Sequence, residues 1–124
     1  MVNSNSLACI ASRCACKAAF KSSAGLAEHL EIMVVPTAPA AVQVLKEAGY
    51  AIYLAAFGGK SALEIEYQSP LCLIIGYEGE GIQPALLKMG TQVTLPQKTA
   101  DVSYNASVAA GILLFLIGTQ QQKI

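Results

Sequence analysis

The sequence has few charged residues, one histidine, one arginine and no tryptophan. Charged residues make up 13% of the chain, the formal net charge is zero, and hydrophobic residues make up 54%. Charge therefore gives no sign of a nucleic-acid partner, because a basic binding module would carry an excess of Lys and Arg. This composition is more typical of a buried, oligomer-forming α/β domain. At 124 residues the chain is long enough for one domain with a real core.

Paired metal-binding cysteines and a long hydrophobic run are also missing. The four cysteines, Cys9, Cys14, Cys16 and Cys72, lack the C-x-x-C pairs of a zinc site. We expect free thiols in a reducing compartment and no metal. The most apolar stretch, residues 108–117, is about half the length of a membrane span. We therefore expect a buried helix there, no membrane partner and a cytoplasmic location.

Residues 1–20 differ in composition from the rest of the chain. They are rich in Ser, Ala and Cys, and the first acidic residue is Glu28. This composition weakly resembles an organelle transit peptide, but the unbroken apolar core of a secretory signal is missing. Residues 1–16 show no clear hydrophobic period and are left unassigned, and we interpret residues 1–20 as a leader or irregular segment. The local excess of Lys and Arg fits a solvated leader better than a phosphate-binding patch.

The hydrophobic pattern of the remaining residues predicts alternating strands and helices. Strands are expected at residues 31–35, 50–57, 71–75 and 91–95, and helices at residues 38–48, 83–89 and 105–119. Prolines near the helix starts and glycines after the helix ends support these bounds. The order β-α-β-β-α-β-α implies a mostly parallel sheet flanked by helices. We assign residues 21–119 to one domain and residues 120–124 to a polar tail.

Two segments near the C-terminus join a strand to a loop suited to ligand binding. The first, LCLIIGYEGEGI at residues 71–82, is an apolar strand that breaks at Gly76 into a glycine-rich loop. The second, residues 94–114, passes from a strand stopped by Pro96 through a polar loop into an apolar helix. Ligands of parallel α/β sheets bind beyond the carboxyl ends of the strands. We therefore expect the two loops to converge on one crevice.

The glycine-rich loop does not match a phosphate-binding motif. Its G-x-x-G-x-G spacing differs from the dinucleotide pattern G-x-G-x-x-G, and no Lys-Ser/Thr follows as in a P-loop. Glu78 and Glu80 also disfavour phosphate, so an uncharged adenosine or a positively charged ligand fits better. Both glutamates are also explained as solvated loop residues, and for Glu80 we favour that interpretation.

Ser103 and Asn105 stand just before the last predicted helix. Asn or Ser at this position is also what an N-cap requires, so capping explains them without catalysis. A Ser-His-Asp hydrolase would use Ser103 or Ser107 with His29 and Asp101. No nucleophile elbow in the sequence supports that alternative.

Together, the two segments resemble the SpoU/TrmH family of RNA ribose 2′-O-methyltransferases, within the SPOUT class. The family pattern L-x-x-G-x-E-G-x-G-I is matched by Leu73, Gly76, Glu78, Gly79, Gly81 and Ile82. The pattern I-P-M-x-G, followed by S-L-N-V-S-V-A-x-x-I, is matched by Leu95-Pro96-Gln97 and by residues 103–112. A weaker similarity at KSSAGLAEHLEIMVV extends the resemblance to about residues 21–117.

The resemblance implies a parallel α/β sheet with a C-terminal trefoil knot whose loops hold S-adenosylmethionine. Carried over residue by residue, it implies cofactor contacts at Phe57, Gly76, Gly81, Ile82, Leu95 and Tyr104. It implies that the active site is shaped by Glu78, Ser103 and Asn105. The implied reaction transfers a methyl group from the sulfonium to a ribose 2′-hydroxyl of tRNA or rRNA, which requires alignment and removal of the hydroxyl proton. The resemblance also implies a homodimer that packs through the knot and the C-terminal helix.

The chain departs from the family pattern at the first motif. A form like N-x-G-A-I-x-R-x-A, with its catalytic arginine, has no counterpart, and Arg13 stands in a different context. We therefore expect a chain that begins after this motif, with the first strands of the sheet missing. One interpretation is an RNA methyltransferase or its cofactor-binding half. The alternatives are a catalytically inactive SPOUT-like domain that binds cofactor, RNA or a partner, and a non-enzymatic assembly protein that docks through its last helix.

Overall fold

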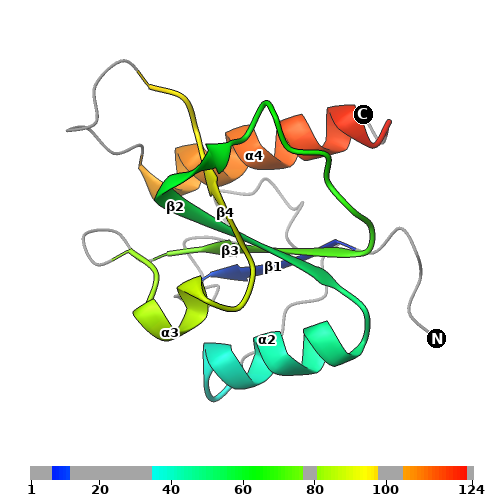
Figure 1. Ribbon diagram of the computed structural model, residues 1–124, viewed down its shortest axis with the longest axis vertical. Coiled ribbons are helices and arrows are strands. Elements are labelled where there is room, and N and C mark those ends of the chain that lie inside the picture. Colours follow the sequence, from blue (N-terminus) through cyan, green and yellow to red (C-terminus); the bar gives the residue numbers. More distant parts are fainter. Residues whose placement is uncertain (1–6, 12–34, 77–80, 98–104, 123–124) are drawn as a thin grey trace, which may run out of the picture.

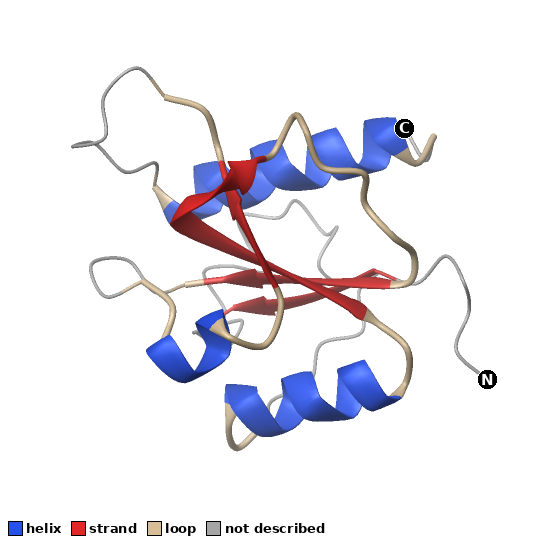
Figure 2. Ribbon diagram, viewed as in Figure 1, coloured by secondary structure: helices blue, strands red, loops and turns tan. Residues whose placement is uncertain are grey.

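The structure, a computed structural model, describes residues 7–11, 35–76, 81–97 and 105–122. The elements in these residues are β1 (Leu7–Ala11), α2 (Ala38–Glu47), β2 (Ala51–Ser61), β3 (Leu71–Ile75), α3 (Pro84–Leu87), β4 (Thr91–Thr94) and α4 (Ala106–Gln120). The strands form one parallel sheet in the order β1-β3-β2-β4. Helix α4 covers one face of this sheet, and α2 and α3 cover the other (Figure 1). Figure 2 shows the same three layers coloured by secondary structure.

The predicted parallel sheet with flanking helices is confirmed. Strand β3 has the predicted bounds, and most other described elements differ from prediction by one or two residues at an end. Strand β2 differs most, because it continues beyond Phe57 to Ser61. Residues 31–34 of the first predicted strand lie outside the described residues, and Val35 belongs to no strand. Strand β1 lies in a segment for which no element was predicted.

Strand β3 forms the centre of the hydrophobic core. All residues of Leu71–Ile75 are buried, as expected for a parallel strand covered by helices on both faces. Its odd-numbered residues pack with Leu113 and Ile117 of α4. Its even-numbered residues pack with Val42 of α2 and Leu86 of α3. The period-two alternation of the strand therefore joins the two helical layers through a single five-residue segment.

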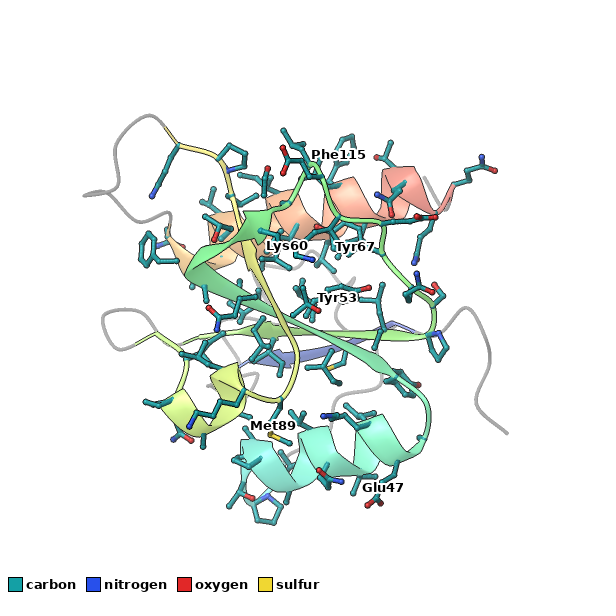
Figure 3. All side chains as sticks on the ribbon, viewed as in Figure 1. Glu47, Tyr53, Lys60, Tyr67, Met89 and Phe115 are labelled. Atoms are coloured by element: carbon teal, nitrogen blue, oxygen red, sulfur yellow. The ribbon has the colours of Figure 1, made fainter. Side chains whose placement is uncertain are left out.

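The connection between β2 and β3, residues 62–70, contains no helix and lies on the α4 side of the sheet. Its apolar residues Ala62, Ile65 and Tyr67 are buried in the core that α4 also contacts. The Tyr67 ring packs edge-to-face on Tyr53 of β2, with ring centroids 5.0 Å apart and planes at 67°. Figure 3 shows both rings between the sheet and α4. The connection therefore fills the space that a crossover helix would otherwise occupy.

Hydrogen bonds tie the end of α4 to this connection. The Gln120 side chain accepts from the Tyr67 N–H at 2.7 Å and donates to the Ile65 carbonyl at 2.6 Å. The Tyr67 hydroxyl donates to the Ala62 carbonyl at 3.0 Å. The Tyr53 hydroxyl accepts from the backbone N–H of the residue after Tyr67 at 2.8 Å. Because a segment without secondary structure must find other partners for its backbone groups, these side chains fix its course.

Tyr67 predicts a loss of stability at alkaline pH. Burial, and to a lesser extent the neighbouring Tyr53, raises the pKa of the Tyr67 hydroxyl above its ordinary value of 10.0. The stabilisation by neutral Tyr67 is therefore fully present below pH 10 and is lost as the pH rises through the folded-state pKa. We expect Tyr67→Phe to lose about 1 kcal/mol at neutral pH with the missing hydrogen bond. The variant should also show a weaker decline of the unfolding free energy above pH 10.

Urea unfolding of both proteins from about pH 7 to pH 11, the range that includes tyrosine titration, measures this difference. Parallel curves of unfolding free energy against pH would contradict a role for the Tyr67 proton.

Two glycines let β4 lie close to β2. A Cβ at Gly90 would lie 2.4 Å from the Ile52 carbonyl oxygen, and a Cβ at Gly59 would lie 2.4 Å from the Gln92 carbonyl oxygen. Both contacts are with backbone, which cannot move aside as a flexible side chain can. Side chains larger than hydrogen at these positions would therefore push the two strands apart.

We expect Gly90→Ala to lower the free energy of unfolding by about 1–3 kcal/mol, since the added methyl group overpacks a strand contact. Gly111→Ala is the matched control, because Gly111 is exposed on α4 and its Cβ would meet nothing within 4 Å. Replacing a helical glycine should raise stability by about 0.5–1 kcal/mol. Urea unfolding measures both values. If Gly90→Ala raises the free energy of unfolding as much as Gly111→Ala does, β4 can move aside to admit the methyl group.

Candidate functional site

The carboxyl ends of β3, β2 and β4 meet at one edge of the sheet. The register pairs Leu54 of β2 with Ile74 of β3, and the next β2 residue with Val93 of β4. Gly76 directly follows β3, and Leu95 directly follows β4. Because the three strands are adjacent and parallel, these residues lie beyond the same edge. Figure 1 shows the end of β3 and the beginning of α4 on this side of the molecule, at the left of the view.

Strand β2 is interrupted at this edge by a bulge, residues 56–59. Val93 lies opposite both Ala55 and Lys60, so the intervening residues leave the ladder. Gly58 within the bulge has φ of 74°, in the left-handed region that glycine favours. The bulge carries Phe57, whose side chain is 60% exposed. The sequence analysis placed Phe57 at the end of a strand, whereas the structure places it on a bulge between two paired segments.

Thr94 of β4 contacts both ends of the bulge. Its hydroxyl donates to the Ala56 carbonyl at 2.6 Å and accepts from the Gly59 N–H at 2.8 Å. Its own carbonyl accepts from the Ala62 N–H at 2.8 Å, just beyond the end of β2. Thr94 matches no motif in the sequence, and no role was predicted for it. No sequence signal could have revealed one, because its side-chain partners are 38 and 35 residues away along the chain.

The glycine-rich loop after β3 closes at its base. A Cβ at Gly76 would lie 2.5 Å from the Gly81 carbonyl carbon and 2.8 Å from the Ile82 nitrogen. Gly81 has φ of 68°. Ile82 is half-buried against the core on the α2 and α3 side of the sheet. The backbone therefore favours glycine at both positions, because a side chain at Gly76 would collide with backbone and Gly81 has a left-handed conformation. Glu78 lies outside the described residues.

The second segment contributes Leu95 and Asn105. Leu95 is half-buried and packs against the core on the α4 side, so its backbone is the part suited to a ligand. Asn105 is the N-cap of α4: its side-chain oxygen accepts from the Ser107 N–H at 2.9 Å and from the Ser107 hydroxyl at 2.6 Å. The predicted capping role of Asn105 is confirmed. Ser103 and Tyr104 lie outside the described residues.

The described part of this edge is rich in backbone groups and poor in titratable ones. Its exposed side chains include Phe57 and Lys60. Across the described ranges, no group of three His, Cys, Asp or Glu side chains could hold a metal ion. Among the helices of those same ranges, none has the length and apolar character needed to cross a membrane. A planar ring that binds main-chain groups and packs on an aromatic side chain suits these residues.

Comparison with known sequences identifies the family. The chain matches the sequence model of the SpoU rRNA Methylase family over residues 1–115. It is 37% identical over 103 residues to an uncharacterized tRNA/rRNA methyltransferase of Synechocystis sp., covering 82% of this chain and 27% of that protein. It is 31% identical over 104 residues to an uncharacterized tRNA/rRNA methyltransferase of Archaeoglobus fulgidus, covering 83% of this chain and 46% of that protein. The chain thus spans less than half the length of either relative.

Solved structures share the fold. The SpoU methyltransferase AviRb from Streptomyces viridochromogenes, in complex with the cofactor AdoMet, superimposes with a TM-score of 0.79 at 22% identity, covering 95% of this chain and 51% of that one. A structure concerned with 2-OH methylation of C/U34 on tRNA superimposes with a TM-score of 0.76 at 18% identity, covering 88% and 72%. Since the family match includes the segment that forms β1 as well as both loop segments, the predicted resemblance is confirmed, and the chain belongs to the SpoU rRNA Methylase family.

Proposed function

We propose that this chain is the S-adenosylmethionine-binding part of an RNA ribose 2′-O-methyltransferase that acts on tRNA or rRNA. Membership of the SpoU family supports the reaction class. The AdoMet complex of AviRb, which shares the fold, supports the cofactor. The single observation that carries the proposal is that Gly76 and Leu95 directly follow parallel strands at the same edge of the sheet at which the β2 bulge carries Phe57.

In this proposal the backbone at Gly76 and Leu95 holds the adenine, and the β2 bulge packs against it through Phe57. Gly81 and Ile82 close the base of the loop and keep Gly76 in place. Hydrogen bonds from main-chain groups to a ring in a partly apolar site are specific because water competes poorly there. Tyr104 completes the cofactor site in the family pattern.

S-adenosylmethionine supplies the methyl group on its sulfonium. Glu78, Ser103 and Asn105 would orient the ribose 2′-hydroxyl and shape the site around it. The oxygen of the Asn105 amide is engaged with Ser107, so Asn105 would offer its amide hydrogens to the substrate. Correct alignment of the 2′-oxygen with the methyl group contributes most to such a transfer.

Two further features of the family belong to the proposal, a trefoil knot and a homodimer. The knot is supported by membership of the SpoU family, and in the structure Gln120 of α4 is hydrogen-bonded to the connection at residues 62–70. The homodimer is supported by an exposed apolar stripe on α4, formed by Val108, Ile112 and Phe115. Figure 3 shows Phe115 on the side of α4 away from Tyr53. We place the protein in the cytoplasm with its RNA substrates.

A catalytically inactive domain that retains cofactor or RNA binding is the second candidate. Departures from the third motif favour it, because Gln97 stands where the family pattern has Met and Tyr104 stands where it has Leu. Binding of cofactor or RNA separates both candidates from a purely structural assembly protein. Transfer of labelled methyl groups to bulk tRNA and rRNA separates the two candidates from each other. A methyl group on the 2′-oxygen would also protect the adjacent phosphodiester from alkali, because the attacking hydroxyl is then blocked.

We expect S-adenosylhomocysteine to bind the purified chain, and Phe57→Ala to weaken binding about tenfold, since base stacking on an aromatic ring is worth about 1–3 kcal/mol. Phe57 suits this test better than Gly76, because truncating an exposed ring leaves no cavity, whereas any Cβ at Gly76 meets backbone. Val44→Ala on α2, where Val44 is 64% exposed, is the control and should leave affinity unchanged. Isothermal titration measures all three proteins. No binding by folded wild-type protein would reject the cofactor site.

We expect wild-type protein to sediment at twice its chain mass of 12.9 kDa. Phe115→Asp should shift it to the mass of one chain, since a carboxylate cannot be buried cheaply in an apolar interface. Val44→Asp, on the opposite face of the sheet, should leave the mass unchanged. Analytical ultracentrifugation decides between these outcomes. Wild-type protein that sediments as one chain at micromolar concentration would rule out the homodimer.

A further inference from the structure

The bulge at residues 56–59 is held by a side chain of a neighbouring strand. The Thr94 hydroxyl donates to the Ala56 carbonyl at 2.6 Å and accepts from the Gly59 N–H at 2.8 Å. This hydroxyl is therefore a hydrogen-bond donor and an acceptor at once, and it bonds the first and last residues of the bulge. Backbone groups that leave a β-ladder would otherwise depend on water for partners.

Backbone packing restricts the bulge further. The position of a Cβ on Gly59 would be 2.4 Å from the Gln92 carbonyl oxygen, so this side of the bulge lies directly against β4. Lys60 and Ser61 then pair with Val93 and Thr94. The other end of the bulge, at Ala56, is held through the hydrogen bond that its carbonyl accepts from the Thr94 hydroxyl. Thr94 therefore controls how far the bulge, and the ring it carries, can move from the sheet edge.

The side chain held in this way is an exposed aromatic ring. Phe57 is 60% exposed and contributes little to either core cluster. Gly58, with φ of 74°, makes the turn at the tip. Phe57 thus differs from the buried rings of Tyr53 and Tyr67, which belong to the core, because it is an exposed ring on a segment fixed by hydrogen bonds and a close strand contact. The arrangement is explained if the ring meets a ligand.

We infer that Thr94 is a positioning residue, whose hydroxyl locks the bulge in the conformation that presents Phe57 to a nucleobase at the carboxyl edge of the sheet. This inference rests on the proposed function, in which that nucleobase is the adenine of S-adenosylmethionine. Thr94 acts through the bulge and touches no ligand. Its contribution is pre-organisation: when only a fraction of molecules holds the binding conformation, the apparent dissociation constant rises by the inverse of that fraction.

The absence of tryptophan from the sequence allows a specific probe. Phe57→Trp introduces the sole indole at the tip of the bulge, and this variant is the parent for all others. Thr94→Val removes the hydroxyl while conserving shape, and Thr94→Ser restores it. Thr94→Ala removes the same hydroxyl without branching and serves as a second variant if Thr94→Val folds poorly. Thr119→Val is the matched control, since the Thr119 hydroxyl donates to the Phe115 carbonyl at 2.7 Å on α4.

Three quantities are measured for each variant: the dissociation constant of S-adenosylhomocysteine from indole quenching, the fluorescence anisotropy of the indole, and the exchange rate of the Gly59 amide hydrogen. We expect Thr94→Val to raise the dissociation constant about tenfold, because both hydrogen bonds that hold the bulge in the binding conformation are lost. It should also lower the anisotropy and accelerate Gly59 exchange. Thr94→Ser and Thr119→Val should stay within about twofold of the parent in affinity. A general loss of packing would not be rescued by serine.

Affinity of Thr94→Val equal to that of the parent, in a folded protein, would overturn the positioning role alone. Failure of wild type and parent to bind S-adenosylhomocysteine would reject the proposed function and the ligand role of Thr94 with it. Quenching by a short oligoribonucleotide, but not by S-adenosylhomocysteine, would overturn adenine as the base that Phe57 meets. Anisotropy that is unchanged by Thr94→Val and Thr94→Ala would show that the hydroxyl does not lock the bulge.

Discussion

Burial of β3 on both faces is the constraint on which the rest of the structure depends. A parallel strand with five consecutive buried residues needs an apolar layer on each side, and α4 supplies one layer while α2 and α3 supply the other. The strand must also be paired along both edges, which β1 and β2 do. Once β3 is enclosed in this way, only its carboxyl end remains open. The glycine-rich loop and the candidate site lie there because the core leaves no other place for them.

The pairing of β2 with β4 shapes the rest of the site. Gly59 and Gly90 let the two strands approach closely, and Thr94 bridges the ends of the bulge between the two paired segments of β2. Residues 51–54 of β2 form an ordinary strand against β3, whereas residues 56–59, further along the same strand, form an irregular segment beside β4. On the α4 side, Tyr53, Tyr67 and Gln120 hold the β2–β3 connection in place without a helix. Both irregular segments are stabilised by side chains distant in sequence.

Elements with strong local signals were predicted well. Strand β3 was recognised by its apolar run and α4 by its apolar length, while Asn105 was recognised by its capping chemistry. The positions of Gly76 and Leu95 at one sheet edge followed from strand direction alone. Strand β1 was missed, because five residues without alternation or turn signals carry too little pattern. The bulge was missed as well: FGGK at residues 57–60 looks like the end of a strand until β4 is placed beside it.

The family and the order of the elements from α2 onward can be read from the sequence, because two long patterns and the hydrophobic period are local properties of the chain. Strand direction also predicts a candidate site at the carboxyl ends of the parallel strands. Only the tertiary structure decided the strand order β1-β3-β2-β4, the course of the connection under Tyr67, and the role of Thr94. The Thr94 and Gln120 side chains bond residues that are 35 or more positions away along the chain, and such pairings leave no mark on any short stretch of sequence.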